Sequence, residues 1–223
     1  ARSDEVRARA SEIEAQALMS KAEQQAALKA FDKALALYRA NPTTKQQDIA
    51  TVLNNRGLLL SDMGRHDEAH ASLSEANRIY RLVYKDNHLK IGQTYYALSL
   101  NDYLRGDLKA AASEIGQALE IYAKVLDPDN FINADALSLQ GQILRDSKQP
   151  AAAEVSLLRA VDIYRKSFGK PHYMIGITDV YLALAASDQG RTARALAYLA
   201  DAKANYDVSY GKEHANHGDL LVN

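Results

Sequence analysis

Histidine and carboxylate side chains that could hold a metal ion stand close together at two places in the sequence. His66 and His70 are four residues apart, so a helix would place both on one face, beside the acidic Asp67. A second pair, His214 and His217, is three residues apart. Such pairs more often belong to a solvated helix face than to a binding site, so we predict no metal and no other cofactor.

Other patterns that carry catalysis are missing from the sequence. It has no Gly-x-Ser-x-Gly turn, no phosphate-binding loop and no dinucleotide-binding glycine pattern. With 0 cysteines there is no cysteine nucleophile, thiolate zinc site or disulfide. We therefore predict that the chain is not an enzyme. Catalysis stays an alternative that measured turnover or a bound metal would reveal.

Charge and hydropathy narrow the class of partner. The 27 Lys and Arg residues against 28 Asp and Glu residues give a net charge of -1, which argues against nucleic acid and anionic membranes. No apolar run approaches the ~20 residues that a membrane span needs. We therefore expect no membrane insertion and a cytoplasmic protein, with the periplasm or another soluble compartment as alternatives.

An internal repeat of 42 residues runs through the chain. Tyrosine recurs once per period, at Tyr38, Tyr80, Tyr122, Tyr164 and Tyr206. Three further columns contain only small residues: Ala15, Gly57, Ser99, Gly141, Ala183; Ala27, Ala69, Ala111, Ala153, Ala195; and Ala34, Ala76, Ala118, Ala160, Ala202. Small side chains at fixed places let two helices approach closely, so these columns predict packing rather than chemistry.

Each period is expected to form two antiparallel helices joined by a short turn, such as the turn at Gly64. We predict one all-α repeat array over 1–223, a solenoid of about five repeats plus the start of a sixth. Its units are approximately 4–45, 46–87, 88–129, 130–171 and 172–213, and 214–223 begin the sixth. Because the sequence stops inside that unit, we expect a fragment of a longer protein. Exposed repeat ends could then self-associate.

One polar column falls at the junctions between the units. It reads His88, Asn130, His172 and His214. Recurrence in register favours a capping or loop-packing role over catalysis.

These columns resemble the tetratricopeptide repeat (TPR), and the 42-residue period is similar to its kinesin-light-chain-like type. The run Leu53-Asn54-Asn55-Arg56-Gly57 matches the L-N-N-L-A start of that type's first helix, apart from Arg56. The junctions at 168–172 and 210–214 resemble its L-G-x-x-H connection. The resemblance covers essentially the whole chain and implies a right-handed superhelical solenoid.

The resemblance also implies where a ligand binds. In TPR proteins the first helices of the repeats line a concave groove, which accepts a partner protein or an extended peptide. Asn and Gln amides can bond a peptide backbone, and tyrosines offer stacking area. The groove positions carried over to this chain are Thr51, Asn54, Asn55, Gln93, Tyr96, Tyr103, Asp135, Gln142, Arg145 and Tyr181.

The sequence therefore predicts a protein–protein interaction module that binds its partner in this groove. The alternative is a regulatory or sensor repeat domain of a larger signalling protein. In that case a kinase or transcription-regulator activity would lie outside the present segment.

Overall fold

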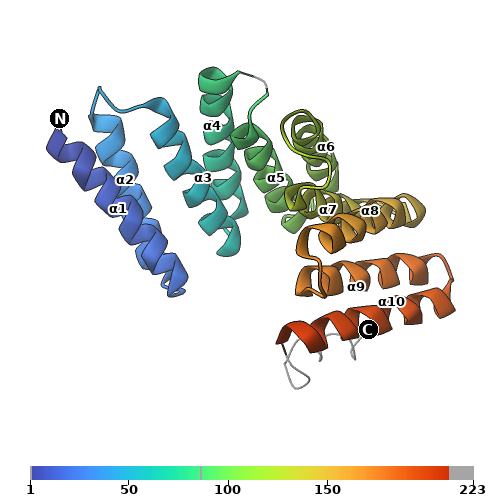
Figure 1. Cartoon of the computed structure of the whole chain (residues 1–223). Helices are drawn as coiled ribbons and strands as arrows, with labels where there is room; N and C mark the ends of the chain where they lie inside the picture. The colour runs from blue at the N-terminus through green and yellow to red at the C-terminus, as the bar shows by residue number, and fades with distance from the viewer. Residues whose placement is uncertain (1, 86, 211–223) are drawn as a thin grey trace. The chain divides into compact units, whose positions relative to one another are not determined.

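The structure, a computed structural model, describes residues 2–85 and 87–210, and these form ten α-helices and no strand (Figure 1). The helices are α1 (Arg2–Ser20), α2 (Gln24–Ala40), α3 (Gln46–Asp62), α4 (His66–Tyr84), α5 (Leu89–Leu104), α6 (Leu108–Val125), α7 (Phe131–Asp146), α8 (Pro150–Phe168), α9 (Tyr173–Asp188) and α10 (Thr192–Tyr210). The predicted all-α class is confirmed. The predicted start of a sixth unit, 214–223, lies outside the described residues.

The chain divides into two compact units, Ala1–Ile121 and Tyr122–Asn223. In the first unit α1 packs against α2 and α3 against α4, while α3 also contacts α2 and α4 also contacts α5 (Figure 1). In the second unit α7 packs against α8 and α9 against α10, with α8 in contact with α9. Successive helix pairs therefore stack on one another within each unit, which is the arrangement of a repeat solenoid.

The two helices of a pair come into close contact at small residues of the first helix. A Cβ atom added to Gly57 would lie 2.6 Å from Cγ of the fully buried Leu73 and 3.3 Å from the backbone oxygen of Ala69. The same addition at Gly141 would lie 2.5 Å from Cγ of Leu157. These distances are shorter than carbon contacts allow, so the column admits nothing larger where it holds glycine.

The third pair, α5 with α6, makes the same close approach through a hydrogen bond. Ser99 is fully buried, and its Oγ donates to the backbone oxygen of Ala111 at 2.8 Å. Glycine and serine thus solve one packing problem in two ways, because the serine hydroxyl replaces a steric fit with a bond to the facing helix.

Three members of the junction column cap the first helices, as their register predicts, and the fourth, His214, lies outside the described residues. The side chains of His88, Asn130 and His172 accept hydrogen bonds from backbone N–H groups two residues later, at 3.1, 3.0 and 3.3 Å. Both histidine rings also stack on the aromatic ring that ends the preceding helix, Tyr84 or Phe168, with centroids 3.8 Å apart. These side chains therefore stabilise the junctions between the repeats.

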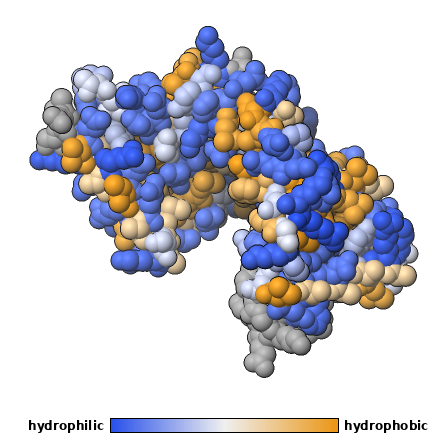
Figure 2. Space-filling view, viewed as in Figure 1, coloured by the Kyte–Doolittle hydropathy of each residue, from blue (hydrophilic) through white to orange (hydrophobic). Residues whose placement is uncertain are grey.

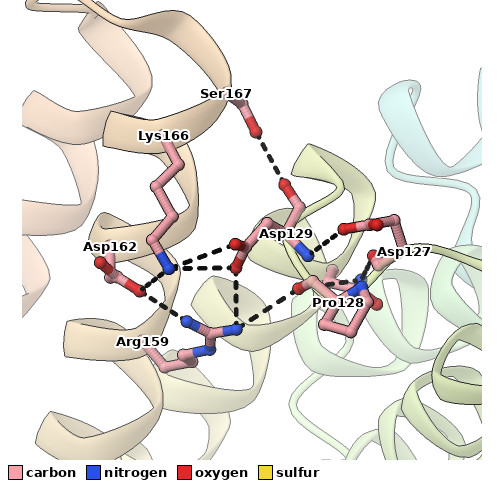
Figure 3. Close-up of polar contacts among 8 residues, drawn as sticks. Asp127, Pro128, Asp129, Arg159, Asp162, Lys166 and Ser167 are labelled. Atoms are coloured by element: carbon pink, nitrogen blue, oxygen red, sulfur yellow. Dashed lines mark hydrogen bonds and ion pairs between the residues drawn. The ribbon is translucent and has the colours of Figure 1, made fainter.

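Charged side chains fix the loop before α7 to helix α8 in the second unit (Figure 3). The carboxylate of Asp129 accepts from Arg159 at 3.0 Å and from Lys166 at 3.2 Å, and its backbone oxygen accepts from Ser167 at 2.9 Å. Lys166 also pairs with Asp162. Since these side chains are nearly half exposed, the network orients the loop more than it stabilises the fold.

Polar side chains cover most of the face seen in Figure 2, and the apolar ones form small patches. Among the described residues, no helix combines the length and apolar character needed to cross a bilayer.

A glycine-to-alanine comparison tests the close contact. Gly57→Ala should lower the free energy of unfolding by about 1–3 kcal/mol, because its Cβ collides with Leu73. Gly116→Ala is the matched control, since nothing lies within 4 Å of an added Cβ there. It should raise stability by about 0.5–1 kcal/mol through helix propensity alone. Urea denaturation of both variants measures these changes in the free energy of unfolding. An equal gain in stability for the two variants would contradict the close contact.

Candidate functional site

The predicted groove residues lie on the first helices of the pairs. In the first unit they occupy α3 and α5, which contact each other, and in the second unit α7 and α9, which also contact each other. All of them are partly exposed, neither buried in the core nor fully open to solvent. Within each unit the first helices therefore present a shared face with accessible polar and aromatic groups.

Two of the predicted groove residues form hydrogen bonds with tyrosines of the repeated tyrosine column. The hydroxyl groups of Thr51 and Tyr80 lie 2.9 Å apart, and the hydroxyl of Tyr164 donates to Oδ1 of Asp135 at 2.5 Å. Burial raises the pKa of Asp135, and the bond from Tyr164 opposes that rise. Thr51 and Asp135 thus hold buried tyrosines, with the remaining surface of each available to a ligand.

The Asn and Arg side chains among the predicted groove residues make weaker or more exposed contacts. Nδ2 of Asn54 donates to Oδ1 of Asn55 at 3.4 Å, near the limit for a hydrogen bond. Arg145 pairs with the half-exposed Asp188 at 3.2 Å. Burial raises the pKa of Tyr181, and the nearby Arg145 charge opposes it, so these two residues approach each other on α7 and α9.

Surface hollows of the described residues lie elsewhere, beside the second helices. One of about 460 Å³ lies among α2, α3 and α4, and one of about 490 Å³ among α4, α5 and α6, both in the first unit. The third, of about 430 Å³, involves α8, α9 and α10 in the second unit. None of the predicted groove residues lines them. The first is crossed by the ion pairs Arg39–Glu75 and Arg56–Asp32.

A polar cluster in the first unit joins three successive helices. Nδ1 of His70 on α4 lies 3.0 Å from Oδ1 of Asp102 on α5, and Glu114 on α6 completes the group. One ligand atom from each residue lies within 4.8 Å of the others. His66, the other histidine of the predicted pair, instead contacts Asn101 at 3.2 Å.

The two carboxyl groups of this cluster face each other in a buried setting. Asp102 is fully buried, and apart from each other its Oδ2 and the Oε2 of Glu114 have no hydrogen-bond partner among the described residues. Burial, and next the charge of Asp102, raises the pKa of Glu114 to about 8. With this pKa, Glu114 keeps its proton at neutral pH and forms a hydrogen bond with Asp102.

Comparison with known proteins accounts for the repeat. The family model described as the tetratricopeptide repeat matches residues 14–81 and 48–122, and a second model of the same description matches 134–173. The chain belongs to the tetratricopeptide repeat family. TPR repeats make it a protein–protein interaction module, and neither match indicates a catalytic family.

Solved structures show the same TPR fold. The structure of BtubC from P. vanneervenii has a TM-score of 0.78 at 16% identity, over 87% of this chain and 77% of that chain. The putative kinesin light chain TPR-like repeats from Podosopora anserina give 0.75 at 17% identity, over 92% and 97%. A signal transduction ATPase from Pyrococcus horikoshii, with a TPR sensor, gives 0.77 at 15% identity, over 95% of this chain and 31% of that chain. At these identities the likeness shows the fold alone.

The two carboxylates of the polar cluster depart from the repeat pattern when the TPR repeats are aligned by their 42-residue period. Position 102 is apolar in the other repeats, which have Leu18, Leu60, Leu144 and Ala186 there. Position 114 holds Ala30, Ser72, Ser156 and Tyr198 in the others. Sequence reasoning that searched for pairs of histidines missed both acids, although their departure from the repeat was a readable signal.

Another buried acid lies between α9 and α10 in the second unit. Asp179 is 1% exposed, and Nδ2 of Asn205 donates to its Oδ2 at 3.2 Å. Burial raises the pKa of Asp179 to about 7, the Arg165 charge opposes the rise and the Asp201 charge adds to it. The folded protein therefore holds this proton far more tightly than the unfolded chain does.

Because the folded protein binds this proton more tightly, the free energy of unfolding should fall as the pH rises. The contribution of Asp179 to the free energy of unfolding is largest below pH ~4 and is lost as the pH rises through about 7. Asp179→Asn should therefore exceed the parent by about 3 kcal/mol at pH 8 and match it near pH 4.

Urea denaturation at both pH values measures this difference. Asp188→Asn serves as the control, because that half-exposed carboxylate should change stability by less than ~1 kcal/mol. A difference between Asp179→Asn and the parent that does not vary with pH would contradict the assignment.

Proposed function

We propose that the chain binds an extended segment of a partner protein along the first-helix face of its TPR repeats. The observation that carries the proposal is the register of the predicted residues, which are all partly exposed and lie on first helices that contact each other within each unit. Surface positions of this kind can contact a ligand without disturbing the core beneath them.

The chemistry of the face suits a peptide backbone. Each Asn or Gln side chain offers both a donor and an acceptor, as a peptide group does. The 3.4 Å contact between Asn54 and Asn55 is weak enough for a ligand to replace. Tyr96 follows one repeat later than Asn54 and adds aromatic area with few rotatable bonds. Several modest contacts on a preformed face keep the ordering cost on the peptide side.

The double variant Asn55→Ala with Tyr96→Ala tests the face. Affinity capture with the repeats and peptide mapping first supply a ligand, and fluorescence anisotropy then measures its affinity. We expect a loss of about 2–4 kcal/mol in binding free energy, typical of removing two central contacts. The variant should remain folded, which its far-UV circular dichroism and thermal midpoint check, because both side chains are partly exposed.

The matched control is Arg78→Ala with Leu82→Ala, on α4 at the hollow between α4 and α6. These side chains are exposed and lie on a second helix, so the ligand should bind that variant as it binds the parent. Binding that survives the first variant and is lost in the control would place the ligand at the second helices instead.

A second candidate function is a sensor domain of a larger signalling protein. The ATPase from Pyrococcus horikoshii carries a TPR sensor, and the likeness covers only 31% of that protein. The same first-helix face would then receive the signal, while an adjoining domain acts on it. The full reading frame discriminates the two, since a kinase or winged-helix segment beside the repeats would favour the sensor.

A further inference from the structure

We propose that His70, Asp102 and Glu114 form a binding site for one divalent transition-metal ion of the zinc class. The site lies within the first unit, where α4, α5 and α6 each contribute one ligand. It is separate from the first-helix face and does not depend on the peptide-binding proposal.

The positions of the candidate ligand atoms suit a metal. One nitrogen or oxygen of each residue lies within 4.8 Å of the others, and His70 Nδ1 and Asp102 Oδ1 are 3.0 Å apart. Tetrahedral zinc, with bonds of about 2.0–2.2 Å, separates its ligand atoms by roughly 3.4 Å. The Glu114 side chain is partly exposed, and the group needs to contract only from 4.8 Å to this spacing.

The buried carboxylate supplies an independent reason for a cation. Oδ1 of Asp102 already has three polar partners. They are His70 at 3.0 Å, Asn101 at 3.1 Å and Arg105 at 3.4 Å. Its Oδ2 is fully buried and faces Glu114, and no other described residue donates to it. Two buried carboxyl groups in contact need a shared proton or a cation between them, and a divalent ion can take the place of that proton.

The surrounding charges do not neutralise the pair. Arg105 is the cation nearest to Asp102, and it divides its contacts among Asp102, the exposed Asp67 at 3.2 Å and Asp107 at 3.5 Å. Asp67 and Asp107 are exposed to solvent, so Arg105 is shared between water-exposed carboxylates and the buried Asp102. A divalent ion restores the balance that the side chains leave incomplete.

A later repeat shows how this protein satisfies a buried acid when no metal is needed. Glu154 stands two repeats after His70, and Arg191, Arg194 and Tyr198 all contact it. Burial raises the pKa of Glu154, but the hydrogen bonds and charges of these partners and of Gln189 outweigh it, so the pKa is lowered. Two repeats earlier, Asp107, Ala110 and Glu114 stand in place of Arg191, Arg194 and Tyr198, so these three donors are replaced.

The ligand set selects the class of ion. One imidazole with two carboxylates suits zinc and its neighbours, whereas Mg²⁺ and Ca²⁺ prefer oxygen ligands throughout. His70 and Glu114 are partly exposed, which gives the ion a way in and leaves coordination positions for water.

Calorimetric titration of the chelator-treated full chain with ZnCl₂ tests the site. We expect one saturable Zn²⁺ per chain and a rise in the melting temperature on binding. Glu114→Gln keeps the shape of the side chain but removes its charge, and should weaken binding by ~100-fold or more. The same variant should lose the metal-induced rise in melting temperature while folding as the parent does.

Two controls separate this site from the histidine pairs of the surface. His66→Gln should bind Zn²⁺ within ~3-fold of the parent, because His66 contacts Asn101 rather than the cluster. The double variant His214→Ala with His217→Ala should likewise retain binding. Zinc binding that needs either control histidine but not Glu114 would overturn the proposal. Absence of saturable binding in the parent would also overturn it, and would mean that the two acids only share a proton.

Discussion

The close approach of the two helices in each pair is the contact on which the rest of the structure depends. Gly57 and Gly141 lie directly against leucines of the facing helix, and Ser99 donates across the same gap to a backbone oxygen. Because the two axes are so near, alanine suffices to fill much of the interior, and few bulky aromatic residues are required. Each pair is thereby a stiff element, which can be stacked on the next without a large shared core.

Stiff pairs leave their outward faces free to carry different chemistry. The first helices contact one another within each unit and leave amide and tyrosine side chains partly exposed. The second helices carry ion pairs such as Arg39–Glu75 around shallow hollows. A preformed array of this kind suits protein binding, since the scaffold gives up little conformational entropy when a flexible partner settles on it.

Departures from the repeat are the most informative residues inside this scaffold. Asp102 and Asp179 occupy buried positions at which other repeats place mainly apolar side chains, and burial raises the pKa of Asp179 to about 7. A packing column tolerates an acid only where a proton, a donor or a cation compensates the loss of water. Glu154 shows the donor solution with its arginines, and Asp179 shows the proton. In the Asp102–Glu114 pair, no other described side chain donates to the facing oxygen atoms.

The sequence by itself determined the helices, their pairing and the family, because a 42-residue period with fixed small residues allows few other packings. It also predicted the capping role of His88 and His172 from register alone, since a cap bonds its own next residues. Only the tertiary structure decided which distant polar groups meet. Thr51 and Tyr80 are 29 residues apart, and His70 and Asp102 are 32 apart. Such contacts depend on the rotation of each helix about its axis and on the distance between axes, and these are set by the packing of all the neighbouring side chains together.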